Sequence, residues 1–225
     1  MKTINPSELS PMQVQMILQT AVSPRPIALA STIDKNGNVN LSPFSFFNLF
    51  SSNPPILIFS PARRVRDNST KDTLHNVLEV PEVVIGNVNF DMVQQVSLSS
   101  TEYETGVDEF IKSGLTKKPS ELVKPPLIAE SPVNFECKVI EVKPLGNEGG
   151  AGNLVICEVL KIHIREEFLN EEGNLDQKKL DLVSRLGGNW YGRTTAETLF
   201  EVPKPLVTKG IGFDQLPSEI RNSKI

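Results

Sequence analysis

The pattern of apolar and polar positions predicts a chain built mainly of β-strands. Residues 27–33 are almost continuously apolar, which is typical of a buried strand. Asp34 to Gly37 supply turn chemistry after it, because glycine takes positive φ without strain. The chain then returns as a second strand and completes a hairpin. Further runs of strand character occupy residues 38–47, 55–60, 82–88, 133–142 and 154–164.

Helical periodicity is confined to a few short segments. The clearest predicts a helix beginning near Ser69, where Ser69 and Asp72 match the capping-box spacing and Leu74, Val77 and Leu78 form an apolar stripe. Pro81 cannot continue that helix. Shorter helices are expected over residues 90–98, 107–113 and 177–182.

Sequential strands joined by hairpin turns favour a mainly β fold with peripheral helices, an antiparallel sheet closed or nearly closed into a barrel. The strand–helix alternation of a doubly wound sheet is absent. No convincing linker divides the sequence, so we expect a single domain over residues 1–225. We expect residues 1–20 to form an N-terminal segment and residues 203–225 a C-terminal arm.

Composition and charge exclude several classes of function. A net charge of −4 and a pI near 5.4 give no electrostatic footprint for nucleic acid. The first residues lack the apolar core of a secretory signal, and no run approaches the roughly 18 apolar residues of a membrane span. Cys137 and Cys157 lie in apolar runs and are expected to be buried, reduced thiols. We therefore expect a cytoplasmic protein with no nucleic-acid or membrane partner.

Two segments could hold a phosphorylated ligand. Lys71 to Thr73 lie at the predicted helix start, where free N–H groups, the lysine charge and a hydroxyl suit a phosphate; plain helix capping is the alternative. Ser31 and Thr32 face Asn40 to Phe47 across the hairpin and could bind a sugar-like chain and a planar heterocycle. A strand edge marked by Pro43 is the alternative there.

Other candidate chemistry stays open or is excluded. Arg63, Arg64 and Arg66 form either a solvated loop or a phosphate clamp. Trp190 and Tyr191 either anchor the core or form an aromatic wall beside a ligand. The connection from Gly146 to Gly152 lacks the spacing of a nucleotide-binding loop and is expected to be a mobile hairpin loop. The histidines and cysteines show no zinc-like spacing, so no metal site is predicted.

Four motifs together resemble one known family. They are Pro24-Arg-Pro-Ile-Ala-Leu-Ala-Ser-Thr32, Asn40-Leu-Ser-Pro-Phe-Ser-Phe-Phe47, Lys71-Asp-Thr73 with Asn76, and Arg185-Leu-Gly-Gly-Asn-Trp-Tyr191. In this order they are similar to the flavin reductase-like, FMN-binding split-barrel family, which includes flavoredoxins and the flavin-reductase component of nitrilotriacetate monooxygenase. The resemblance implies a six-stranded Greek-key split barrel and a homodimer with FMN near the subunit interface.

The resemblance also implies the cofactor-binding residues. Those expected along the isoalloxazine and ribityl chain are Ser31, Thr32, Asn40, Leu41, Ser42, Pro43, Ser45, Phe46 and Phe47. Those expected at the phosphate end are Lys71, Asp72, Thr73 and Asn76.

The implied function is that of an FMN-binding oxidoreductase, in which NAD(P)H reduces FMN and a partner monooxygenase receives the reduced flavin. No side chain is needed as an obligatory acid or base, so no catalytic residue is predicted. One departure weakens this reading, because many NAD(P)H-dependent relatives carry a histidine where this chain has Gly152 or Asn153. The alternatives are an FMN-bound electron carrier that NAD(P)H does not reduce directly, and a barrel that has lost its flavin.

Overall fold

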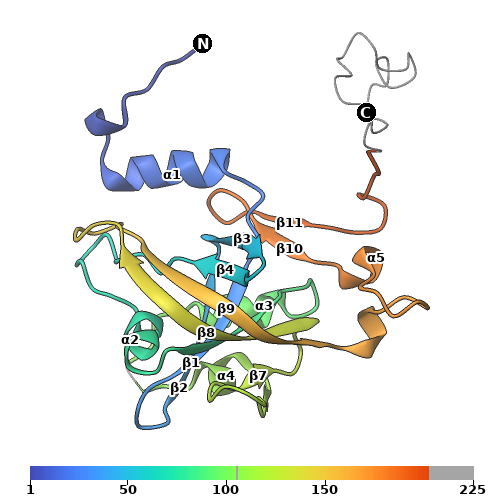
Figure 1. The fold of residues 1–225 in the computed structure, drawn as a ribbon. Coiled ribbons are helices and arrows are strands. Elements are labelled where there is room, and N and C mark those ends of the chain that lie inside the picture. The colour runs from blue at the N-terminus through green and yellow to red at the C-terminus, as the bar shows by residue number, and fades with distance from the viewer. Residues whose placement is uncertain (105, 203–225) are drawn as a thin grey trace, which may run out of the picture.

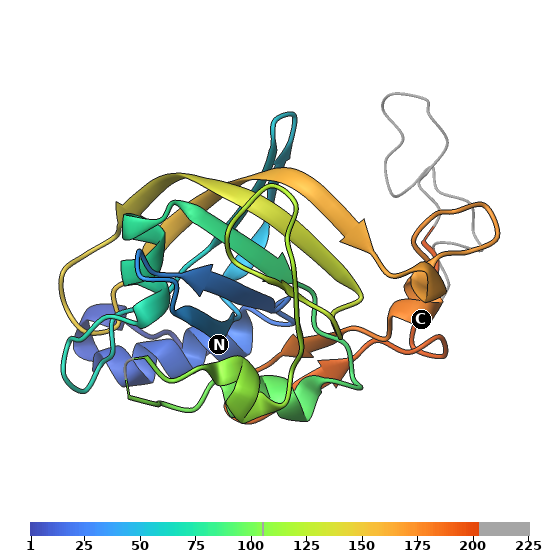
Figure 2. The same cartoon turned by 90° about the horizontal axis from the view of Figure 1, so that it is seen from below.

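A computed structural model describes residues 1–104 and 106–202 of the chain and shows one large antiparallel sheet (Figure 1). Its seven strands follow the order β2-β1-β5-β8-β9-β4-β3, and every neighbouring pair is antiparallel. Seen from below, the sheet curves around a common interior (Figure 2). The strands are β1 (Ala28–Ile33), β2 (Val39–Phe44), β3 (Phe47–Ser52), β4 (Pro55–Phe59), β5 (Glu82–Gly86), β8 (Val133–Pro144) and β9 (Asn153–Ile164).

Helices and short strand pairs lie around this sheet. The 3₁₀ turns are η1 (Pro6–Glu8) and η2 (Glu166–Phe168). The α-helices are α1 (Pro11–Ala21), α2 (Asp72–Glu79), α3 (Val93–Ser99), α4 (Glu109–Ser113) and α5 (Gln177–Leu180). The two small sheets pair β6 (Lys117–Lys118) with β7 (Leu127–Ile128) and β10 (Val183–Arg185) with β11 (Tyr191–Arg193). No helix in the described part is both long and apolar enough to span a membrane.

The two edge strands of the sheet, β2 and β3, are consecutive in the chain. The single strand expected over residues 38–47 is therefore wrong, because the chain bends at Ser45 and Phe46 and leaves β1 to pair with β4. The Phe46 carbonyl accepts a hydrogen bond from the Ser60 amide, and Ser45 Oγ accepts one from Arg25 Nε. These tertiary contacts fix the bend, and local sequence does not reveal them.

Helix α2 begins later than predicted. Its first residue is Asp72, and its N-cap, Lys71, makes no side-chain capping bond. Ser69 instead donates to Asp67 Oδ1, 2.6 Å away, so the capping-box prediction is wrong. Leu74 and Val77 are buried as expected, but Leu78 is 62% exposed. An unsatisfied helix N-terminus is thus left beside the β1–β2 hairpin.

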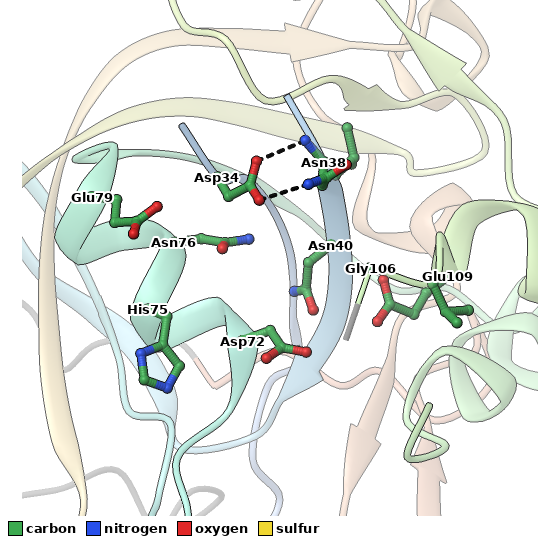
Figure 3. Close-up of a pocket in the computed structure, with 11 residues that line it drawn as sticks. Asp34, Asn38, Asn40, Asp72, His75, Asn76, Glu79, Gly106 and Glu109 are labelled. Atoms are coloured by element: carbon green, nitrogen blue, oxygen red, sulfur yellow. Dashed lines mark hydrogen bonds between the residues drawn. The ribbon is translucent and has the colours of Figure 1, made fainter. Parts of the chain in front are cut away.

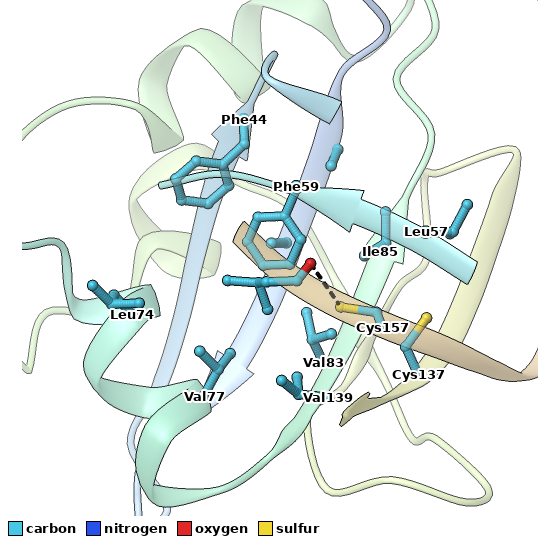
Figure 4. Close-up of a cluster of buried hydrophobic side chains, with 13 residues drawn as sticks. Phe44, Leu57, Phe59, Leu74, Val77, Val83, Ile85, Cys137, Val139 and Cys157 are labelled. Carbon is cyan, nitrogen blue, oxygen red and sulfur yellow. Dashed lines mark hydrogen bonds between the residues drawn. The ribbon is translucent and has the colours of Figure 1, made fainter. Parts of the chain in front are cut away.

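The barrel interior is filled by side chains from nearly every strand (Figure 4). Phe44 and Phe59 pack at its centre with ring centroids 5.3 Å apart. Cys137 and Cys157 are free and buried, as predicted, and burial raises the pKa of Cys137 to about 12. The thiols are therefore packing groups rather than nucleophiles.

The β10–β11 hairpin carries the only tryptophan of the chain, and Trp190 is 76% exposed. The interpretation of this residue as a core anchor is therefore wrong. Arg185 stacks on Tyr191 with the guanidinium carbon 4.4 Å from the ring centroid. The predicted arm over residues 203–225 lies outside the described residues.

Candidate functional site

A buried polar network joins helix α2 to the β1–β2 hairpin. Thr32 Oγ1 accepts hydrogen bonds from the side-chain amides of Asn40 and Asn76, at 3.4 and 3.1 Å. The Asn40 amide also donates to Thr73 Oγ1 at 2.9 Å. All of these side chains are at least nine-tenths buried. The structure thus brings together Thr32, Asn40, Thr73 and Asn76, and their hydrogen bonds hold the start of α2 against the sheet.

Ser31 and Leu41, also expected near the cofactor, are fully buried. Ser31 Oγ has no hydrogen-bond partner among the described residues, and the Leu41 amide donates to Glu109 Oε2 at 2.9 Å. Pro43 and Phe47 are half-buried on the strands beside the bend. Their contact with a cofactor stays a prediction.

Two basic side chains converge on a pocket of about 150 Å³ at the start of α2. Lys71 and Arg64 line it with Ser42, the loop from Ser99 to Tyr103, and the acidic residues Asp72 and Glu109. The Lys71 ammonium lies 4.9 Å from the centre of the Phe44 ring and forms no ion pair with any described residue. Burial, and then the charge of Arg64, lower the pKa of Lys71. A bound anion would offset both effects, because it would neutralise two close cations in a partly desolvated site.

Glu102 faces the same two cations. Its Oε1 lies 3.5 Å from Arg64 Nε and forms an ion pair with Arg66 Nη2. Glu102 also opposes the lowering of the Lys71 pKa. Two hydrogen bonds fix the Arg64 guanidinium: its Nη1 donates to Ser69 Oγ at 3.0 Å and to the Thr70 carbonyl at 2.7 Å. An entering phosphate would meet the fixed guanidinium of Arg64 and the Lys71 ammonium, with the carboxylates of Asp72, Glu102 and Glu109 in the same lining.

A neighbouring pocket of about 360 Å³ lies on the other side of Asn40 and Asp72 (Figure 3). It is acidic, because the carboxylates of Asp34, Asp72, Glu79 and Glu109 line it. Burial raises the pKa of Glu109. No group of three or more possible metal ligands was found among the described residues. No Lys or Arg lines this pocket, whereas Lys71 and Arg64 line the other one, so an anion is better matched to the Lys71 pocket.

Arg25 organises the bend at Ser45. It is only 7% exposed, and besides Ser45 it donates to the carbonyls of Val22 and Leu186, each at 2.9 Å, and of Gln19. One guanidinium thus joins the end of α1, the β10–β11 turn and the β2–β3 bend. The sequence places Arg25 in the motif from Pro24 to Thr32, but nothing in the local pattern reveals this role.

The arrangement suits binding more than acid–base catalysis. A phosphate monoester matches the two cations and the free amides at the start of α2, since charge-assisted hydrogen bonds are the strongest available there. His75 is the nearest histidine, and its Nε2 lies 2.6 Å from Thr70 Oγ1. The arginine cluster was expected to be either a solvated loop or a phosphate clamp. Arg64 lines the pocket, whereas Arg66 does not line it and pairs with Glu102, which does.

Comparisons with known proteins show the family and the fold. The family model described as "Flavin reductase like domain" matches residues 21–182. An uncharacterized protein of Halalkalibacterium halodurans is 38% identical over 208 residues, which cover 92% of this chain and 98% of that protein. The crystal structure of nitrilotriacetate monooxygenase component B from Bacillus cereus has a TM-score of 0.83 and 28% identity, covering 90% of this chain and 98% of that one. The 2-nitrobenzoate 2-nitroreductase of Pseudomonas fluorescens has a TM-score of 0.80 and 28% identity, covering 93% and 100%.

Proposed function

This chain belongs to the flavin reductase-like family of FMN-binding split barrels, and we propose that it is an NAD(P)H:flavin reductase that supplies reduced FMN to a partner monooxygenase. The observation that supports this most is the pocket where Lys71 and Arg64 converge beside the free start of α2. The similarity to the Bacillus cereus monooxygenase component supports the kind of partner.

The proposed FMN site runs from the Lys71 pocket toward the β2–β3 bend. Lys71 and Arg64 would hold the phosphate, while the Thr32–Asn40–Thr73–Asn76 network fixes α2 in place behind it. The ribityl chain would pass Ser42, and the ring would lie beside the bend at Ser45 and Phe46. When bound, FMN supplies two-electron redox chemistry, and the chain contributes binding, orientation and electrostatics. Arg25 fixes the bend, and through the bend it would position the ring.

A second candidate is an FMN-bound electron carrier, and one feature favours it. Many NAD(P)H-dependent relatives have a histidine where this chain has Gly152 or Asn153. A Cβ at Gly152 would lie 2.6 Å from Ser60 Oγ, and the buried Asn153 side chain donates to the Pro61 carbonyl at 3.0 Å. Neither position presents a side chain that could replace the histidine beside a nicotinamide.

An anaerobic titration of the FMN-loaded protein with NADH and then NADPH separates the two candidates. We expect bleaching of the visible flavin absorption within the mixing time of the experiment. Dithionite provides the control for complete reduction. If NADH and NADPH both leave the flavin oxidised and only dithionite bleaches it, the reductase proposal fails and the carrier replaces it.

We also propose that the working form is a homodimer. No residue of helix α1 is buried, and Met12 and Met16 on it are 60% and 64% exposed. On β3, Leu49 and Phe50 are exposed by 62% and 63%. Exposed apolar side chains on α1 and β3 offer surface that a second copy would cover. We expect sedimentation velocity to show a dimer and Phe50→Glu to give a monomer with weakened FMN binding. A wild-type monomer that binds FMN fully contradicts the proposal.

A further inference from the structure

The acidic pocket beside Asn40 is not used by the proposed flavin chemistry. Its volume is about 360 Å³, and residues of α2, of the β1–β2 hairpin and of the segment at the start of α4 line it (Figure 3). Four of the lining side chains are carboxylates, and none is a lysine or an arginine. The charge of the lining therefore matches a small cation.

Two of these carboxylates already have partners. Asp34 accepts hydrogen bonds from the backbone amides of Asn36 and Asn38 and from the Asn38 side-chain amide, each at 2.8 Å. Glu79 Oε1 lies 3.6 Å from Lys35 Nζ. These two carboxylates make the pocket more negative without needing a further partner.

The other two carboxylates, Asp72 and Glu109, form no ion pair with any described residue. They point toward each other across the pocket (Figure 3). Glu109 is nine-tenths buried, and its Oε2 accepts the Leu41 amide while its Oε1 accepts no hydrogen bond from the described residues. Burial raises the pKa of Glu109, and the charge of Asp72 adds to this effect. A bound cation would oppose both influences.

Two buried asparagines add oxygen atoms without partners. The side-chain nitrogens of Asn40 and Asn76 are used in the network around Thr32, but their Oδ1 atoms accept no hydrogen bond from the described residues. Neither oxygen is among the enclosed unpartnered atoms of the described chain, which are Ser31 Oγ and Asn89 Oδ1. Asn76 points from α2 into the acidic pocket and does not line the Lys71 pocket, so its oxygen opens here (Figure 3).

The free groups of this pocket are all hydrogen-bond acceptors, so a matching ligand brings the donors. The described residues hold no group of three or more possible metal ligands. An ammonium ion suits the pocket better, because it is a compact cation with three N–H donors. Val39 and Val107, both half-buried, form the apolar part of the lining, against which an alkyl chain can pack.

We propose that this pocket binds a protonated aliphatic diamine. One ammonium group donates to Glu109 Oε1 and Asn76 Oδ1 and faces Asp72, while the alkyl chain packs on the two valines. The second ammonium group is attracted by the remaining carboxylates of the lining. Nothing in this arrangement depends on bound FMN, so the proposal goes beyond the proposed function.

The test compares three compounds with one four-carbon chain. At pH 7, 1,4-diaminobutane carries two positive charges, 1-butylamine one and 1,4-butanediol none. Isothermal titration calorimetry at low ionic strength should show one site for the diamine, with an affinity at least about tenfold above that of 1-butylamine and no binding of the diol. The proposal is overturned if the diamine fails to bind, binds no more tightly than 1-butylamine, or is displaced by an equal concentration of magnesium chloride.

Two glutamates of the same pocket locate the bound ammonium group. Glu109→Gln removes an unpaired charge but keeps an oxygen for the Leu41 amide, and it should weaken diamine binding at least about tenfold. Glu79→Gln removes a charge already paired with Lys35 and should weaken binding less than about threefold. Equal losses would mean diffuse attraction by the acidic lining and overturn the proposal.

Two further variants complete the comparison. Glu141 is exposed on β8 outside the pocket, so Glu141→Gln changes the net charge by the same amount and should leave diamine binding unchanged. If circular dichroism shows that Glu109→Gln does not fold, Asp72→Asn tests the same ammonium group from the opposite wall, with the same expected loss. Full diamine affinity in a folded variant of either residue overturns the proposal.

Flavin absorption of the FMN-loaded protein, followed during the titration, keeps the two hypotheses separate. Retained FMN shows that the diamine and the flavin occupy different sites, as proposed. Displacement of FMN by 1,4-diaminobutane shows one shared site, and the proposal of a separate amine pocket fails. If FMN never binds, the proposed function fails, while diamine binding that Glu109→Gln weakens still supports the amine site.

Discussion

Lys71→Ala should weaken FMN binding roughly 10- to 150-fold while changing riboflavin affinity less than about twofold. The expected size follows from the loss of one charged hydrogen bond, which contributes about 1.5–3 kcal/mol. Riboflavin lacks the phosphate and therefore makes no use of the Lys71 ammonium. Quenching of flavin fluorescence during titration measures both affinities in the same buffer.

Two further variants sharpen this experiment. Lys112 is exposed on α4 and forms no ion pair among the described residues, so Lys112→Ala should leave both affinities unchanged. Glu102→Gln should act in the opposite direction and tighten FMN binding by about two- to fivefold, the size of an exposed ion-pair effect. If Lys71→Ala weakens FMN and riboflavin binding equally, the assignment of the FMN phosphate to this pocket is wrong.

The sequence predicted most strands of the fold but not its decisive bend. Alternation and apolar runs identify β1, β4, β5, β8 and β9 because each has a period that local residues reveal. The bend at Ser45 depends on Arg25, twenty residues earlier, and on the Ser60 amide. Such distant contacts leave no periodic signal, so β2 and β3 were predicted as one strand and most of β3 was missed.

The candidate site shows the same limit. Lys71 and Thr73 were identifiable because they stand together at a predicted helix start, and Asn76 was implied by the family resemblance. Arg64 and Glu102 lie 38 residues apart, and only the fold brings them to one pocket. Thr32 and Asn40 were predicted as ligand contacts from their polarity. Their geometry shows a tertiary reason for that polarity, since they hold α2 to the sheet.

Glu136 is the clearest case of a residue whose role the sequence concealed. Alternation along β8 points Val133, Cys137 and Val139 inward and would place Glu136 on a solvated face. Glu136 is instead completely buried, because the loop after β6 covers it. Its carboxylate accepts backbone hydrogen bonds from Glu121, Leu122 and Val123, at 3.0, 2.6 and 3.0 Å, and lies 2.6 Å from His163 Nε2.

Glu136→Ala should therefore lower the free energy of unfolding by about 3–5 kcal/mol, the cost of breaking a buried charged network. Glu136→Gln should cost less, since its amide oxygen still accepts some of these bonds. Urea unfolding followed by far-UV circular dichroism measures the difference at fixed protein and FMN concentrations. Glu141, exposed on the same strand, is the matched control, and Glu141→Ala should change stability by less than about 0.5 kcal/mol.

The pH dependence of this effect tests its electrostatic origin. Burial is the largest influence and raises the pKa of Glu136, but the hydrogen bonds from the loop amides and His163 together bring that pKa below its ordinary value. A lowered pKa in the folded state means that the carboxylate stabilises the protein above pH ~4.3 and loses this contribution as pH falls through the folded pKa. The stability gap between wild type and Glu136→Gln should therefore be constant near neutrality and narrow below pH ~4. A gap that stays constant on acidification would show that packing, not charge, holds this loop.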